Sequence, residues 1–262
     1  MQVAAAAFPV TWNLDANLAH MERALAACEP DSLVAFPEGA LSGYSDGLEG
    51  LAALEPSRLE AALAHLESLA ARRDVRVALG TLWPGPGGQW TNSAVILAPR
   101  APRWWYHKVN LATHERGRLA CGQALEVRRG APAALAVQLC RDLRFPDQWR
   151  WLAHQGAQVI LYLTHAVGQP DAFSVWKSHL VSRAAENQRF VVAVNTARTD
   201  SMCPTAIIDP RGRVLAEAAT ADAQLISATL DLGQVSDWYL SQARTDLLPL
   251  VGPLAAASRP SP

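Results

Sequence analysis

The sequence predicts an α/β protein built from several layers. Short apolar runs typical of buried strands alternate with helical patterns early and midway along the chain, and a strand-rich segment follows. Of the 262 residues, 50% are hydrophobic and 18% are charged, which is enough apolar material for a large core. Because no Ser/Gly linker or charge block divides the chain, we expect one domain over residues 1–254 and a disordered tail, AAASRPSP, over 255–262.

Nine apolar runs are expected to be strands. They are mostly continuous rather than alternating, which is typical of strands that are covered on both faces. They occupy residues 2–8, 32–37, 75–83, 93–98, 134–140, 157–163, 190–195, 205–210 and 224–232. A further strand, rich in aromatic residues, is expected just before Lys108. The Pro- and Gly-rich segment 83–90, WPGPGGQW, is expected to be a surface loop.

Four helices are expected between these strands, at residues 15–28, 57–72, 146–156 and 174–188. Asp15 is the expected N-cap of the first helix. Ser57 and Glu60 have the spacing of a capping box at the start of the second. Pro146 is a residue favoured at the first helical position, and Gly156 is favoured just beyond a helix end, so these two residues delimit the third helix.

The charge balance argues against nucleic acid and membrane partners. The chain has 23 Lys and Arg against 24 Asp and Glu, a formal net charge of −1, so no basic surface for nucleic acid is expected. The apolar run VAAAAF at residues 3–8 is too short to span a bilayer, and no basic segment precedes it. We therefore expect neither a membrane segment nor a signal peptide.

The cysteines and histidines predict a reduced, cytoplasmic protein without a metal site. The four cysteines are far apart and form no C-x-x-C pair of the kind found in zinc ribbons; they are Cys28, Cys121, Cys140 and Cys203. His107 and His114 are seven residues apart and do not form an H-E-x-x-H pattern.

Cys140 lies in the stretch QLCRDLRFP, between an expected buried strand and the helix that begins near Pro146. A strand–cysteine–helix order is typical of a nucleophile elbow, in which a sharp turn exposes a reactive side chain at the end of a sheet. The alternative is that Cys140 is a small buried apolar residue at a strand end. A thiol nucleophile also requires a base and donors for an oxyanion, and neither is adjacent in the sequence.

Three other residues can supply these groups. Glu38 follows an apolar strand in LVAFPEGALSGY, and Lys108 follows the aromatic strand in YHKVNLATHERG, with Glu115 seven residues later. Each of these residues taken alone is ordinarily a solvated loop or surface residue.

Together, the sequences around Glu38 (FPE…GY), Lys108 (HKVNL…E) and Cys140 (CRDLRFP) resemble the three signatures of the nitrilase superfamily of carbon–nitrogen hydrolases, in the same order and at similar spacing. The likeness continues through GAQVILYLTHA, SRAAENQRFVVAVN and AIIDPRGRVLAE, and so covers nearly the whole chain. The resemblance implies a four-layer α-β-β-α sandwich that forms homodimers or larger homo-oligomers by packing helices together. It implies no cofactor.

The resemblance also implies roles for these residues. Cys140 matches the nucleophile, Glu38 the general base and acid, and Lys108 the cation beside the tetrahedral intermediate. Glu115 matches a second glutamate near the lysine. These roles agree with elementary chemistry, because a carboxylate can take the thiol proton and a cation can stabilise an oxyanion.

Further family patterns are interpreted as structural. Asp142 and Arg144 match C-x-D-x-R, which we interpret as a salt-bridged brace under the turn. The residues Arg183, Glu186 and Asn187 lie on one expected helix, and we interpret them as packing and ion-pair residues.

Three positions depart from the family pattern. Arg141 stands where an aromatic residue is common, Asn110 replaces a histidine, and His165 lies in THAVG where relatives often have a proline and an aromatic residue. Arg141, which can also donate its backbone N–H to the oxyanion, and His165 are expected to border the cleft. A guanidinium there suits a carboxylate, so the expected substrate is an acid-bearing amide such as an ω-amide or an N-carbamoyl amino acid. The alternative is that Arg141 turns away and pairs with Asp147.

The function that follows is hydrolysis of a non-peptide carbon–nitrogen bond in a small linear amide, through a cysteine thioester, with release of ammonia or an amine. One alternative is a nitrilase that uses the same residues on a nitrile. The other is a catalytically silent binding protein that retains the fold. The short chain favours an amidase or carbamoylase over a nitrilase, and the intact Glu38, Lys108 and Cys140 argue against a silent protein.

Overall fold

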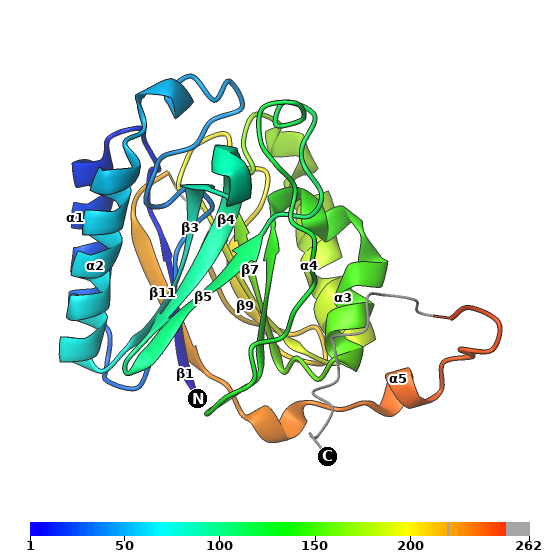
Figure 1. Cartoon of the computed structure of the whole chain (residues 1–262). Coiled ribbons are helices and arrows are strands. Elements are labelled where there is room, and N and C mark those ends of the chain that lie inside the picture. Colours follow the sequence, from blue (N-terminus) through cyan, green and yellow to red (C-terminus); the bar gives the residue numbers. More distant parts are fainter. Residues whose placement is uncertain (219–220, 250–262) are drawn as a thin grey trace, which may run out of the picture.

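Two β-sheets pack face to face in the computed structural model, which describes residues 1–218 and 221–249 (Figure 1). The first sheet has six strands, in the order β11 (Gln224–Thr229), β1 (Gln2–Ala7), β2 (Leu33–Ala35), β3 (Arg76–Pro84), β4 (Trp90–Ala98) and β5 (Ala101–His107). The second has five, in the order β10 (Val214–Ala218), β9 (Thr205–Ile208), β8 (Phe190–Asn195), β7 (Val159–Thr164) and β6 (Leu135–Leu139).

Helices cover the outer face of each sheet. The six-stranded sheet carries α1 (Leu14–Ala26) and α2 (Pro56–Arg73), and the five-stranded sheet carries α3 (Pro146–His154) and α4 (Phe173–Asn187) (Figure 1). A short helix, α5 (Trp238–Ser241), follows the last strand. The layers therefore follow the order α-β-β-α, which confirms the predicted fold class.

The central strands of both sheets are buried on both faces, which explains their continuous apolar runs. In β1, Ala4 and Ala6 face the helices, whereas Val3 and Ala5 face the other sheet. β8 has the same alternation, with Val191 in the helix-facing core and Val192 in the core between the sheets. Because both faces meet apolar partners, no polar residue is needed at alternate positions.

The helices lie where they are expected, but the N-caps of α1 and α2 differ from the expected ones. Asn13, not Asp15, is the N-cap of α1, and its side chain accepts a hydrogen bond from the Ala16 N–H at 3.0 Å. The capping box of Ser57 and Glu60 does not form: α2 begins one residue earlier, at Pro56, whose fixed φ favours the first helical position. Glu60 instead accepts a hydrogen bond from Arg103 at 2.8 Å.

The expected ends of the third helix are confirmed. α3 begins with Pro146 at its first position, and Gly156, just beyond its end, has a φ of 87°. That left-handed conformation is one that glycine adopts without strain.

All nine apolar runs contain strands, and the aromatic strand before Lys108 is β5. The sequence analysis missed β10, an edge strand that pairs only with β9. Its Val214 and Leu215 are exposed, so it lacks the apolar continuity by which the other strands were predicted. Segment 83–90 is the turn between β3 and β4, although Trp83, Pro84 and Trp90 belong to the strands themselves.

The predicted disordered tail, residues 255–262, lies outside the described residues, and so does the expected domain boundary at residue 254. Over the described part of the chain, no helix combines the length and apolar character needed to cross a membrane.

Candidate active site

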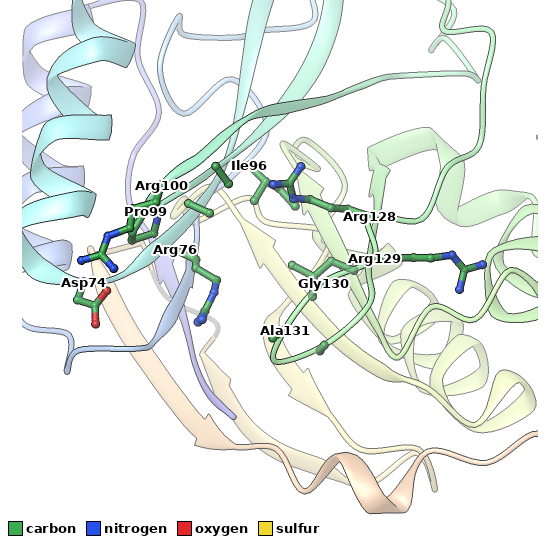
Figure 2. A pocket seen from close by; sticks show the side chains of 13 residues that line it. Asp74, Arg76, Ile96, Pro99, Arg100, Arg128, Arg129, Gly130 and Ala131 are labelled. Carbon is green, nitrogen blue, oxygen red and sulfur yellow. The ribbon is translucent and has the colours of Figure 1, made fainter. Parts of the chain in front are cut away.

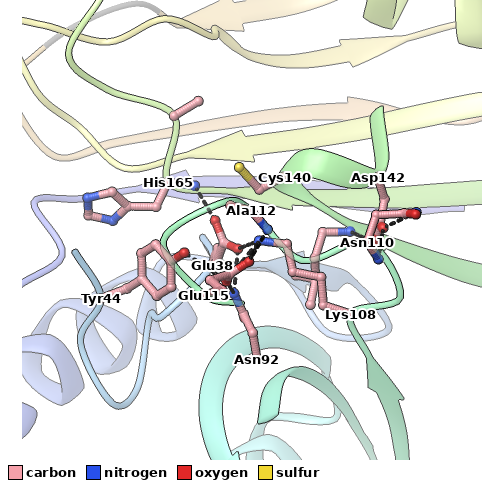
Figure 3. A network of polar contacts seen from close by, with 12 residues as sticks. Glu38, Tyr44, Asn92, Lys108, Asn110, Ala112, Glu115, Cys140, Asp142 and His165 are labelled. Atoms are coloured by element: carbon pink, nitrogen blue, oxygen red, sulfur yellow. Dashed lines mark hydrogen bonds and ion pairs between the residues drawn. The ribbon is translucent and has the colours of Figure 1, made fainter. Parts of the chain in front are cut away.

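Four functional candidates follow directly or closely after the ends of strands. Lys108, Cys140 and His165 come immediately after β5, β6 and β7, and Glu38 comes three residues after β2. β2 and β3 are parallel, and β5 runs in the same direction as β3 because both are antiparallel to β4. The ends of β2 and β5 thus lie at the same edge of one sheet, and the parallel β6 and β7 end together in the other. Figure 3 shows the side chains of Glu38, Lys108 and Cys140 gathered together, with the His165 ring directed away from them toward Tyr44.

Cys140 is the first residue of a 3₁₀ turn, Cys140–Arg144, that links β6 to α3. Its φ is 39°, a left-handed conformation that is strained for a residue with a side chain. Tyr162 donates a hydrogen bond to the Cys140 carbonyl at 2.8 Å and so fixes the turn from the neighbouring strand. The residue is only partly buried. This geometry is that of the predicted nucleophile elbow.

The carboxylate of Asp142 holds the turn in place by accepting hydrogen bonds from three other residues. Its Oδ2 accepts hydrogen bonds from the Leu139 N–H at 3.0 Å and the Tyr106 hydroxyl at 2.8 Å. Its Oδ1 accepts two from Asn110, through the backbone N–H at 3.0 Å and the side-chain amide at 2.9 Å. The unusual asparagine two residues after Lys108 therefore ties the lysine segment to the cysteine turn.

The prediction of a salt bridge between Asp142 and Arg144 was wrong. Asp142 is buried, whereas Arg144 is exposed, stacks over the Trp176 ring at 4.9 Å and donates to His179 at 3.0 Å. Residues two apart in a 3₁₀ turn point in different directions, which separates the two side chains.

The other predicted structural residues behave as expected. Arg183 forms an ion pair with Glu186 at 2.8 Å and donates to the Leu143 carbonyl, and Asn187 donates to the Arg183 carbonyl. They fasten α4 to the turn that carries the cysteine.

A buried cluster of charges lies beside Cys140. Lys108 Nζ is 2.8 Å from Glu38 Oε1 and 3.0 Å from Glu115, and all three side chains are 0% exposed. One cation between two carboxylates leaves a net negative charge, which neutral donors stabilise. Asn92 donates to Glu38 at 2.7 Å and to Glu115 at 2.6 Å, and the His165 backbone N–H donates to Glu38 Oε2 at 2.9 Å.

Glu115 receives two further hydrogen bonds that Glu38 does not. The Tyr44 hydroxyl donates to Oε1 at 2.8 Å, and the Ala112 N–H donates to Oε2 at 2.6 Å. Burial would raise the pKa of Glu115, but Lys108 and these donors outweigh it and lower that pKa. Burial prevails at Glu38 and raises its pKa, and the negative charge of Glu115 adds to the effect. The surroundings therefore favour the ionised form at Glu115 and the protonated form at Glu38, each relative to an ordinary glutamate.

The pKa values of the cation and the thiol follow from the same cluster. Burial alone would lower the pKa of Lys108, but Glu38, Cys140 and Glu115 outweigh it and raise that pKa, so the ammonium group persists. Burial, together with the charge of Glu38, raises the pKa of the Cys140 thiol to about 12. The resting side chain is therefore a neutral thiol at neutral pH.

Sequence reasoning missed three residues of this site. Asn92, which bridges both carboxylates, lies between Thr91 and Ser93 in β4, just before the expected apolar run 93–98, and no sequence pattern distinguished it from its polar neighbours. Tyr44 is part of the quoted FPE…GY pattern but was given no role. Gly80 lies inside β3, where a Cβ atom would stand 2.5 Å from the Glu38 Cα, so only glycine lets the Glu38 backbone approach this closely.

The two substrate-binding candidates come from different segments: Arg141 lies in the cysteine turn, and His165 follows β7. His165 is 6% exposed and its ring packs against the Tyr44 ring, and its Nδ1 has no hydrogen-bond partner within the described part of the chain. Burial and the nearby Arg198 lower the pKa of His165 to about 4, so the imidazole is neutral. The guanidinium of Arg141 is exposed, and the alternative pairing with Asp147 does not occur. Among residues 1–218 and 221–249, no group of three or more His, Cys, Asp or Glu side chains could hold a metal ion.

Comparison with known proteins adds independent information. A family model described as carbon–nitrogen hydrolase matches residues 2–239. An (R)-stereoselective amidase from Pseudomonas sp is 31% identical over 226 residues, which cover 84% of this chain and 80% of the relative. A deaminated glutathione amidase from Synechocystis sp. (strain PCC 6803 / GT-S) is 30% identical over 230 residues, 79% of this chain and 83% of the relative. The crystal structure of an amidase from Nesterenkonia sp. superposes with a TM-score of 0.79 at 24% identity, over 94% of each chain, and shares the fold.

Proposed function

The chain belongs to the carbon–nitrogen hydrolase family, as an amidase-like member of the nitrilase superfamily, and we propose that it hydrolyses a small linear amide through a thioester on Cys140. In this proposal Glu38 is the general base and acid, and Lys108 stabilises the oxyanion. The observation that carries it is the strand-end cysteine beside a buried lysine that lies between two carboxylates with opposite pKa shifts.

The first half of the reaction acylates the cysteine. Glu38 takes the thiol proton as Cys140 Sγ attacks the amide carbonyl carbon. The resulting oxyanion is stabilised by Lys108 and by the backbone N–H of Arg141, and one such donor contributes ~10²–10³ in rate. Glu38 then gives its proton to the leaving nitrogen, which departs as ammonia or an amine. Because the thiol is neutral at rest, the two proton transfers leave the charge of the cluster unchanged.

The second half hydrolyses the thioester. Glu38, again ionised, takes a proton from a water molecule that attacks the acyl carbon, and the same cation and N–H stabilise the second oxyanion. Collapse of this intermediate releases the carboxylic acid, and the thiolate recovers its proton from Glu38. A carboxylate with a raised pKa suits this work, since it must accept and release protons twice in each cycle.

The two curated relatives described above are both named amidases, which supports an amide substrate over a nitrile and an enzyme over a silent binding protein.

We also infer a cytoplasmic homodimer or larger homo-oligomer. Cys28, Cys121, Cys140 and Cys203 are all free, as in a reducing compartment. Phe145 and Val175, beside α3 and within α4, are 40% and 47% exposed, which suits packing between helical layers.

The direct test is a screen of small amides, nitriles and N-carbamoyl amino acids for ammonia release, with Cys140→Ala as the blank. We expect at least one amide or carbamoyl compound to be hydrolysed by the wild type and not by the variant. Turnover of nitriles alone would favour the nitrilase alternative. Equal ammonia release by Cys140→Ala would remove Cys140 from the mechanism.

The pH dependence should reflect Glu38. The base must be ionised, so kcat/KM should fall as the pH decreases through the raised pKa of Glu38, with a midpoint above the ordinary glutamate value of 4.5. Glu115→Gln removes a negative charge that raises this pKa, so the midpoint should move to lower pH. The variant should also lose kcat, because Lys108 loses one of its two carboxylate partners.

The control is the same substitution at Glu67, a surface residue paired with Arg103. Glu67→Gln should leave both kcat/KM and the acidic midpoint unchanged. An unchanged kcat/KM in Glu115→Gln, or a midpoint that moves to higher pH, would contradict the role given to Glu115.

A further inference from the structure

A cavity of about 440 Å³ is lined by three arginines, two of which directly follow residues of the proposed site in the sequence. We call it the arginine cavity; Arg116, Arg141 and Arg144 line it, together with Asn110 and Phe145 among others. Arg141 directly follows the nucleophile, and Arg116 directly follows Glu115. The cavity is therefore bounded by the two segments that hold the reacting thiol and the lysine cluster.

The positive charge of the arginine cavity is not balanced by a carboxylate among its lining residues. No Asp or Glu lines it, and the guanidinium groups of Arg116 and Arg141 form no hydrogen bond or ion pair among the described residues. Arg144 differs, because its stacking on Trp176 and its hydrogen bond to His179 hold it in place. Two unpaired guanidinium groups that line one cavity provide the charge and the planar donor geometry that suit a carboxylate.

We propose that the arginine cavity binds a carboxylate of the substrate, and that Arg141 and Arg116 select acid-bearing amides over neutral ones. This rests on the proposed function. The backbone N–H of Arg141 belongs to the proposed oxyanion site. The side chain of Arg141 therefore starts from the residue that would contact the reacting carbonyl. The substrate class is then an ω-amide of a short dicarboxylic acid or an N-carbamoyl amino acid, in which a few bonds separate the carboxylate from the reacting carbon.

A second arginine-lined cavity offers a contrast and a control. It has a volume of about 350 Å³ and lies near the turn between β4 and β5, away from the residues in Figure 3. Arg76 there pairs with Asp31 at 2.8 Å, and Figure 2 shows Arg129 directed away from the other labelled side chains. Arg128 lines this cavity and its guanidinium has no partner among the described residues, so Arg128→Leu removes the same charge at a distance from the proposed site.

The experiment compares kcat/KM, measured by ammonia release, for succinamic acid and its methyl ester, and for N-carbamoylalanine and its methyl ester. Wild type, Arg141→Leu, Arg116→Leu and Arg128→Leu are assayed side by side. For at least one pair, wild type should prefer the acid by ~10-fold or more, about 1.4 kcal/mol. Arg141→Leu should lose this preference mainly through KM, Arg116→Leu should weaken it, and Arg128→Leu should keep it. The preference should also fall with added salt, because both arginines are exposed.

The outcomes separate this inference from the proposed function. If wild type hydrolyses acid and ester equally well, or if Arg141→Leu and Arg116→Leu both keep the preference, the inference is overturned and the amidase proposal stands. If wild type hydrolyses neither member of either pair, the inference is also overturned, and the broader screen decides the amidase proposal. If the preference is seen with succinamic acid, the substrate class is an ω-amide; if it is seen with N-carbamoylalanine, the substrate class is an N-carbamoyl amino acid. Thermal unfolding of each variant verifies that the exposed substitutions leave the fold intact.

Discussion

Cys140→Ser is expected to reduce kcat/KM to less than about a tenth of the wild-type value while leaving the protein folded. A hydroxyl is far less acidic and less nucleophilic than a thiol, so Glu38 cannot generate an equivalent nucleophile from it. The thiol lies at the end of β6 on a turn fixed by Asp142 and Tyr162, and neither contact involves the sulfur atom. The substitution therefore changes the reaction and leaves the turn in place.

The matched control is Cys28→Ser. Cys28 is a buried, free cysteine beyond the end of α1, and its thiol donates to the Ala24 carbonyl, a bond that a serine hydroxyl can also make. We expect wild-type kcat/KM from this variant. Retention by Cys140→Ser of more than about a tenth of the activity would mean that another group is the nucleophile.

Glu38→Gln is expected to lower kcat/KM by ~10²–10⁴, the usual contribution of a general acid–base group. The amide has nearly the same shape as the carboxylate but cannot take the thiol proton. Lys108 keeps its ion pair with Glu115, so the buried cation is not left without a partner. The acidic limb of the pH profile should vanish in this variant, because the group that titrates there is gone.

The same substitution should have a modest cost in stability. Glu38 Oε2 accepts a hydrogen bond from the buried His165 N–H, and Oε1 accepts from Lys108 and Asn92. One of these positions becomes an NH₂ group that faces another donor, and a buried unsatisfied donor costs about 1–3 kcal/mol. Thermal unfolding measures this loss. Glu67→Gln serves again as the control, and near-normal turnover by a folded Glu38→Gln would contradict the assignment of the base.

The fold could be predicted well from the sequence because the central strands of both sheets are covered on both faces. Continuous apolar runs then mark the strands, and only the exposed edge strand β10 escapes this criterion. Helix positions were correct, but two caps were not. The choice between nearby candidates such as Asn13 and Asp15 depends on where the first turn begins, and apolar spacing does not define a helix start to within two residues.

The site could be predicted only in part, for a different reason. Glu38, Lys108, Glu115 and Cys140 each stand in a recognisable local pattern, and the fold brings them together. Asn92 stands among polar residues near the start of β4, Gly80 lies within the apolar strand β3, and the importance of both arises from contacts with Glu38.

The opposite pKa shifts of the two glutamates also lay beyond sequence reasoning. Burial prevails at Glu38, whereas Lys108 and the hydrogen-bond donors around Glu115, Tyr44 and Ala112 among them, outweigh burial there. Likewise, Asp142 and Arg144 are two residues apart in the chain, but the turn directs one inward and the other outward.

The central claim is a thioester on Cys140, and the most direct test is to trap it. An aryl ester of the acid whose amide is hydrolysed best should acylate the enzyme faster than the thioester hydrolyses. The reaction is quenched in acid within a turnover, and the protein is analysed by intact mass and peptide mapping. We predict a mass increase equal to one acyl group on the Cys140 peptide, which disappears on further turnover and is absent from Cys140→Ser. An acyl group on any other residue, or rapid turnover with no acylated protein at any time, would contradict the mechanism.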